Sequence, residues 1–260
     1  MTTVVTTPAK ARTQPARRSE AGIPFTRLLR VEWGKATDTR AARWLLLLVA
    51  VATAGLMLAP LLARHSVDQT QTNYLDFAAL GLSMLLPVVA ILMLTSEWTQ
   101  RTVLTTFTQE PRRIRVVNAK VTVSVLLALL GSAFGGLVTL AAILIAQASG
   151  RTVTADLHTS QAIGFVLYVL LNVLIGVALG AVLHNTAAAI VLFFVLPTAF
   201  GFLSSAIKSV GNWIDPARTG DWVQAGQWSG HVGQIIVVTA LWVVLPLAAG
   251  MFRTVRREIK

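Results

Sequence analysis

Six long apolar stretches, none of which contains an Asp, Glu, Lys or Arg, constrain this chain more than any other feature. They cover residues 44–62, 77–95, 121–147, 163–183, 187–207 and 235–252. Each is close to the roughly 20 residues that an α-helix needs to cross a bilayer core of about 30 Å. Because backbone polar groups in lipid must bond within their own segment, we expect six transmembrane helices. The alternating ten-residue strands of a membrane β-barrel are absent from the sequence.

Composition supports an all-α membrane protein with one transmembrane domain over residues 44–252. The chain has 260 residues, of which 55% are hydrophobic and 13% charged, with a mean hydropathy of +0.68. Soluble domains carry about 25% charged residues, and a chain this short has no water-soluble core large enough to hide so much apolar surface. It contains no cysteine, which excludes disulfides and thiolate metal sites.

The positions of the basic residues predict the orientation in the membrane. Of the 22 Lys and Arg residues, nine lie in residues 10–43, five in 101–120 and four in 253–260. Lys and Arg gather in cytoplasmic loops, so we expect both termini, including the basic C-terminus 253–260, to be cytoplasmic. The net charge of +11 is thereby explained by topology and by contact with anionic lipid headgroups. No nucleic-acid partner is expected.

Two segments with different patterns precede the first apolar stretch. Residues 1–22 are rich in Thr, Ala, Pro and Arg, which predicts a disordered basic tail. Residues 23–43 carry apolar side chains at helical spacing, namely Phe25, Leu28, Leu29 and Trp33. Arg27, Arg30 and Lys35 project elsewhere, so this segment is predicted to be an amphipathic helix on the membrane surface. The alternative is that it continues the tail.

No catalytic constellation is expected in this chain. Gly34 and Lys35 lack the upstream glycine and the following Ser or Thr of a phosphate-binding loop. The four histidines are scattered, and a metal site using His158 with Asp156 is an open alternative that the spacing does not demand. Ion-coupled transporters use ionisable groups inside the membrane, and the six apolar stretches have none. Energy for transport would therefore come from a partner.

The segment 96–120 is the strongest candidate for contact with such a partner. Its partial apolar face ends before Pro111, which would stop a helix there. The alternative is a basic linker whose arginines only set the topology. The segment resembles the loop after the second span in permeases of the ABC-2 family, the membrane subunits of ABC exporters. The matching residues are Glu97, Thr102, Pro111, Arg112, Arg113 and Lys120. Arg101 replaces the usual glycine, and Glu32 and Lys35 resemble the family's membrane-surface helix.

This resemblance implies a function in a bacterial plasma membrane. The chain would form the translocation pathway with a second permease subunit, in a homo- or heterodimer. Two copies of a separate ATPase would supply ATP hydrolysis with Mg²⁺, so no cofactor is expected in this chain. The resemblance implies a coupling interface made of Glu97, Arg101, Thr102, Phe107, Pro111, Arg112, Arg113 and Lys120. Arginine suits such an interface because its planar fork pairs with carboxylates.

The segment 208–234, opposite the predicted cytoplasmic side, contains Trp213, Trp222 and Trp228. Tryptophan favours the membrane–water boundary, so these residues either anchor the protein or, as the family would imply, belong to an outer gate of short re-entrant helices.

Two other functions are alternatives to the exporter. One is a membrane anchor or assembly factor that moves nothing, and the other is an independent channel or facilitator. The substrate is not identified by the sequence.

Overall fold

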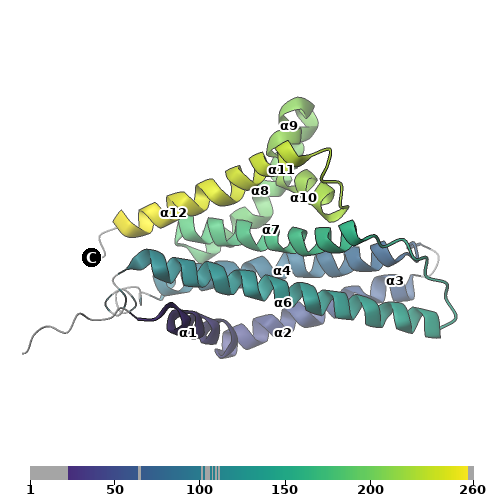
Figure 1. Ribbon diagram of the computed structural model, residues 1–260, viewed down its shortest axis with the longest axis horizontal. Helices are drawn as coiled ribbons and strands as arrows, with labels where there is room; N and C mark the ends of the chain where they lie inside the picture. Colours follow the sequence, from purple (N-terminus) through teal and green to yellow (C-terminus); the bar gives the residue numbers. More distant parts are fainter. Residues whose placement is uncertain are drawn as a thin grey trace, which may run out of the picture.

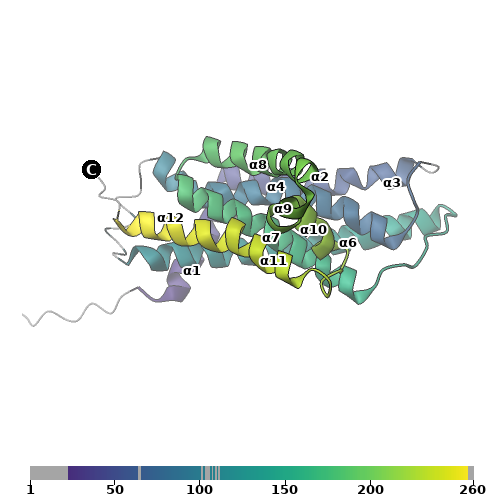
Figure 2. The same ribbon diagram turned by 90° about the horizontal axis from the view of Figure 1, so that it is seen from above.

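Each apolar stretch folds into a helix, because a helix satisfies its own backbone groups segment by segment. The computed structural model describes residues 23–63, 66–100, 102, 106, 108, 110 and 112–256. Over these residues six helices are long and apolar enough to cross a membrane: Arg40–Leu62, Gln71–Thr99, Arg113–Ala148, Thr159–Leu183, Thr186–Ala206 and Val232–Arg256. They lie roughly along one axis (Figures 1 and 2). The predicted all-α architecture with six candidate spans is confirmed, whereas residues 1–22 lie outside the described part.

Two of these membrane-length helices consist of shorter elements: Arg40–Leu62 contains α2 and α3, and Val232–Arg256 contains α11, η1 and α12. The elements are α1 (Phe25–Thr37), α2 (Arg40–Leu56), α3 (Leu58–Leu62), α4 (Gln71–Thr99), α6 (Arg113–Ala148), α7 (Thr159–Leu183), α8 (Thr186–Ala206), α9 (Lys208–Ile214), α10 (Pro216–Gln224), α11 (Val232–Thr239), η1 (Ala240–Val244) and α12 (Leu245–Arg256). η1 is a short π-helical stretch that joins α11 to α12. In the described part, strand-like pairing is limited to one isolated bridge between Thr70 and Thr154.

The helices extend beyond the uncharged stretches that predict them. As a result, α4 carries Asp76 near its first turn and Glu97 near its last, and α6 carries Lys120 two turns from its start. These ionisable side chains therefore belong to membrane-length helices, although the apolar stretches themselves are uncharged. Hydropathy alone does not reveal these charged side chains as parts of the long helices.

Helices α4 and α7 form the centre of the bundle. Buried residues make up 67% and 56% of their most apolar stretches, against 11% for α8. Glycines allow α7 to lie against α4, because a Cβ on Gly176 would stand 2.9 Å from the carbonyl oxygen of Pro87. Gly131 and Gly135 of α6 likewise face leucine side chains of α4. The two Gly-xxx-Gly pairs thus serve packing inside one subunit.

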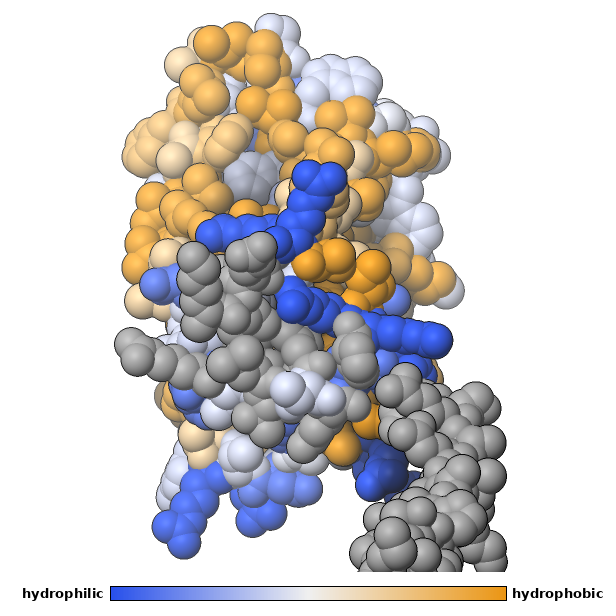
Figure 3. Space-filling model, turned by 90° about the vertical axis from the view of Figure 1, so that its left-hand side faces the viewer, coloured by the Kyte–Doolittle hydropathy of each residue, from blue (hydrophilic) through white to orange (hydrophobic). Residues whose placement is uncertain are grey.

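Both ends of the described chain lie beside the start of α6 at one end of the bundle, on the left of Figure 1. Contacts agree with this placement, since Arg113 donates to the carbonyl oxygen of Thr254 at 2.9 Å and Arg115 donates to that of Ile23 at 2.6 Å. Figure 3 looks onto this end and shows strongly hydrophilic side chains in the middle and lower part of the view, with hydrophobic ones mostly above them. We call it the basic end.

Away from the basic end, α9 and α10 fold back as two short helices, α10 against α7 and α9 against α8 (Figure 1). Asp215 joins them and is buried. Its carboxylate accepts hydrogen bonds from the backbone nitrogens of Ala217 at 3.0 Å and Arg218 at 3.4 Å, and from the hydroxyl of Ser204 at 2.8 Å. Asp215 is therefore the N-cap of α10 and also ties it to α8.

Replacing Asp215 with alanine is expected to lower the free energy of unfolding by about 1–2 kcal/mol, the usual cost of losing a helix cap. Asp215→Asn keeps the oxygen that accepts both backbone bonds, and its amide nitrogen can donate to the Ser204 hydroxyl in place of accepting from it, so it should lose much less. Thermal unfolding of the two purified variants in one detergent measures the difference. Equal stability of Asp215→Ala and Asp215→Asn would contradict the capping role.

Candidate functional site: an ionic cluster at the basic end

Helix α1 places two charged side chains toward the bundle. Its buried residues are Leu28, Glu32 and Ala36, which are four positions apart and therefore share one face. Glu32 thus points inward with the apolar residues. Leu29 and Trp33 are partly buried against the core, whereas Phe25 is exposed. The face that the sequence assigns to membrane contact is used in part to pack α1 against the helices behind it.

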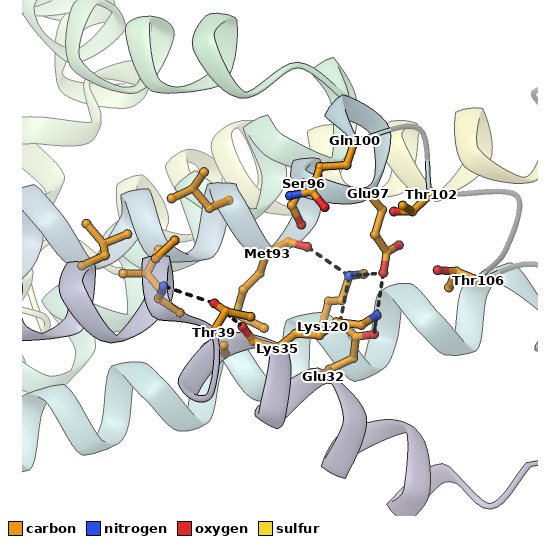
Figure 4. A pocket seen from close by; sticks show the side chains of 16 residues that line it. Glu32, Lys35, Thr39, Met93, Ser96, Glu97, Gln100, Thr102, Thr106 and Lys120 are labelled. Atoms are coloured by element: carbon orange, nitrogen blue, oxygen red, sulfur yellow. Dashed lines mark hydrogen bonds and ion pairs between the residues drawn. The ribbon is translucent and has the colours of Figure 1, made fainter.

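Four charged side chains from three helices meet at this position (Figure 4). Lys35 of α1 donates to Glu32 and to Oε1 of Glu97, both at 2.6 Å. Lys120 of α6 donates to Glu32 at 2.8 Å, to Oε1 of Glu97 at 3.2 Å and to the carbonyl oxygen of Met93 at 3.0 Å. We call Glu32, Lys35, Glu97 and Lys120 the ionic cluster. It joins α1, α4 and α6.

The members of the ionic cluster differ in their burial. Glu32, Glu97 and Lys120 are at least 92% buried, whereas 41% of the Lys35 side chain is exposed. Two carboxylates and two ammonium groups balance in charge, as burial of ions requires. Burial disfavours the charged form of Lys35, but the carboxylates of Glu32 and Glu97 outweigh this and hold the pKa of Lys35 above its ordinary value.

The segment between α4 and α6 is held by a backbone hydrogen bond at its start and by an ion pair at its end. At its start, the backbone nitrogen of Thr102 donates to the carbonyl oxygen of Glu97 at 3.0 Å. At its end, the buried carboxylate of Glu110 accepts from Arg115 at 3.0 Å and from the backbone nitrogen of Arg112 at 3.3 Å. Both ends of the segment are therefore attached to helices of the bundle, at α4 and at α6.

Two residues that sequence reasoning missed, His184 and Thr254, extend this connection to α7 and α12. His184 is the C-cap of α7, with a left-handed backbone conformation at φ 51°, and its ring is buried. The ring lies 4.0 Å from that of Trp98 in α4, and Nε2 is 3.1 Å from the hydroxyl of Thr254 in α12. The available signal was a lone histidine between two apolar stretches, which does not indicate its partners.

The predicted coupling residues have different surroundings in the structure. Glu97 and Lys120 belong to the ionic cluster, Thr102 and Arg112 are exposed, and Arg113 holds the end of α12. Arg101, Phe107 and Pro111 lie outside the described residues. The structure brings Glu97 and Lys120 together with Glu32 and Lys35, residues that the sequence places in a separate surface helix.

The three candidate gate tryptophans lie in or just after the short helices α9 and α10, away from the basic end. Trp222 stacks on His231 with ring centroids 4.0 Å apart, and Trp228 donates to the carbonyl oxygen of Val223 at 3.0 Å. Trp213 is 44% exposed. They do not form one cluster with the ionic residues, which lie at the basic end.

Within the described part of the chain, no three His, Cys, Asp or Glu side chains gather as a metal site would require. No protein-family model matches the chain, and no curated protein is significantly similar to it. What the site can do follows from its own geometry. The ionic cluster connects the three helices α1, α4 and α6 beside the segment that follows α4.

Proposed function

We propose that this chain is the membrane subunit of an ATP-driven exporter in a bacterial plasma membrane, with the basic end in the cytoplasm. The segment 96–120 would dock on a separate ATPase, which binds ATP and Mg²⁺. Movement driven by nucleotide would pass through the ionic cluster into α1, α4 and α6. In this arrangement α1 lies at the membrane surface, as its basic exposed side chains favour.

The observation that carries this proposal is the attachment of the segment 96–120. Glu97 and Lys120 stand at its two ends and meet Glu32 and Lys35 within 3.2 Å. Arg113 and Arg115 add hydrogen bonds to the end of α12 and the start of α1. A simple linker that only sets topology has no need of buried carboxylates at both of its ends. The attachment therefore favours mechanical coupling.

A second permease subunit would complete the translocation pathway. The spans Arg40–Leu62, Thr186–Ala206 and Val232–Arg256 bury 11–22% of their most apolar stretches, so each offers a broad face to lipid or to a partner subunit. At the other end, α9 and α10 with Trp213, Trp222 and Trp228 would form the outer gate. We propose these two roles from the arrangement of the helices together with the family resemblance.

Replacing Arg112 with alanine is expected to reduce ATP turnover of the purified complex severalfold without loss of the folded membrane subunit. The reason is that Arg112 is exposed beside the segment, where a guanidinium can pair with carboxylates of a partner. The tagged chain is purified from its native membranes, and co-purified ATPase is identified and assayed. Arg30→Ala, an exposed arginine of α1 at the same end, is the matched control.

Two results would overturn the exporter proposal. One is a purified complex that contains no ATPase, which would favour the membrane anchor or the independent channel. The other is ATP turnover that is equally unaffected by Arg112→Ala and by the double change of Arg101 and Arg112. Loss of turnover in Arg30→Ala to the same extent would show a general effect of charge at the basic end.

A further inference from the structure

A cavity of about 450 Å³ lies beside the ionic cluster. Its walls come from α1, the start of α2, the last turns of α4, the segment after α4, and Lys120 of α6. Figure 4 shows the polar side chains of Lys35, Ser96, Glu97 and Gln100 around it. The volume falls in the range of sites that hold small organic ligands, and nothing in the proposed coupling function requires a hollow at this point.

The cavity changes from polar to apolar along the helices. Glu97 and Lys35 line one part of it, and Leu45, Val89 and Leu92 line another. Val89 precedes Glu97 by eight positions on α4, so it lies about 12 Å deeper along the helix at 1.5 Å per residue. A charged part at the end of the bundle and an apolar part deeper in the span fit an amphiphile rather than a water-soluble ion.

Two hydrogen-bonding groups of the ionic cluster have capacity left for a ligand. Both bonds to Glu97 end on Oε1, and within the described residues its Oε2 accepts none. An ammonium group has three donors, and Lys35 uses two of them, on Glu32 and Glu97. In contrast, Lys120 uses three. The cavity thus presents one carboxylate oxygen and one ammonium N–H, within a cluster of zero net charge.

We propose that this cavity binds the headgroup of a membrane phospholipid that carries a primary ammonium group, as phosphatidylethanolamine does. The ammonium donates to Oε2 of Glu97, and the phosphate accepts from Lys35. The glycerol and upper acyl chains lie against Leu45, Val89 and Leu92. A phosphatidylglycerol headgroup offers Glu97 only neutral hydroxyl donors and no cation, and a choline headgroup lacks N–H groups. The lipid would hold α1 and α2 against α4 whether or not the chain exports anything.

Native mass spectrometry of the purified full chain tests this with three lipids of identical acyl chains. Phosphatidylethanolamine is expected to be retained several-fold more than phosphatidylglycerol or phosphatidylcholine. Glu97→Gln should weaken phosphatidylethanolamine retention about tenfold, the usual scale for losing a hydrogen bond to a charged group. Soluble glycerophosphoethanolamine should compete poorly, because it cannot use the apolar part of the cavity.

A second variant keeps the test independent of the ionic cluster. Ala42 lines the cavity, so Ala42→Trp should fill it and abolish the preference for phosphatidylethanolamine. Ala54 is exposed on the same helix and lies outside the cavity, so Ala54→Trp should keep the preference. Equal retention of the three lipids by the unchanged chain would overturn the proposal, as would full retention by Ala42→Trp. Equally tight binding of glycerophosphoethanolamine would replace the lipid with a soluble ligand.

Discussion

Replacing Lys120 with methionine is expected to destabilise the chain by about 3–5 kcal/mol, the cost of leaving a buried ion without its partner. Lys120 contacts both Glu32 and Glu97, and its side chain is 5% exposed. Methionine fills a similar volume but brings no charge. Two buried carboxylates then share Lys35, so the cluster has a net negative charge in a poorly hydrated place. One of the carboxylates must be protonated, or the helices must separate to admit water.

Thermal or denaturant unfolding in one detergent measures this effect, and Lys35→Met is the matched control. Lys35 also bridges Glu32 and Glu97, but 41% of its side chain is exposed. Its removal leaves the same net charge on the cluster, but water already solvates part of this contact, so we expect a smaller loss than for Lys120→Met. The double variant Lys120→Met with Glu32→Gln removes one charge of each sign and should recover part of the lost stability. When the single variant Glu32→Gln is measured as well, the four stabilities give the coupling energy of the pair.

The idea of a structural ionic cluster fails if Lys120→Met unfolds like Lys35→Met. It also fails if the double variant is less stable than Lys120→Met alone. Either result would mean that water or detergent solvates the carboxylates fully, and that the distances seen here have little energetic weight. The proposed coupling route through α1, α4 and α6 would then lose its physical basis.

Each of the six uncharged stretches is about as long as a helix that crosses the bilayer core, and this length can be read from the sequence. The sequence therefore predicts the six spans. It does not predict where the helices end. The helix α4 continues from the last apolar residue to Thr99, and this extension brings Glu97 into the bundle. Hydropathy cannot place a charged residue at a helix end, because the same residue is tolerated both in water and in a paired buried site.

The ionic cluster could be predicted only in parts. The sequence assigns Glu97 and Lys120 to the segment after the second span, and Glu32 and Lys35 to the surface helix. Their contact depends on how α1 packs against α6, over a separation of 88 positions between Glu32 and Lys120. The spacing of apolar residues along one helix does not reveal which residues of a distant helix it will contact. The contact between His184 and Thr254, which are 70 positions apart, was missed for the same reason.

At the other end of the bundle, replacing Gly164 with alanine is expected to lower the free energy of unfolding by about 2–3 kcal/mol, as overpacking of a close contact does. Gly164 lies in the first turns of α7, where α10 packs on it. A Cβ there would overlap the carbonyl oxygen of Val223 and stand 2.8 Å from that of Gln224. Both are backbone atoms, so no side-chain rotation relieves the overlap and α10 must move away from α7.

Displacement of α10 should also break the bond from Gln224 to Asp76 of α4, which is 2.6 Å long. The effect is therefore local, and hydrogen exchange should rise in residues 216–224 while the basic end keeps its protection. The control is Gly136→Ala in α6, where an added Cβ meets nothing within 4 Å. That change should be neutral or stabilise by up to about 1 kcal/mol through helix propensity. Unchanged exchange in α10 of Gly164→Ala would show that the outer helices are loosely held, which favours a mobile gate over a fixed cover.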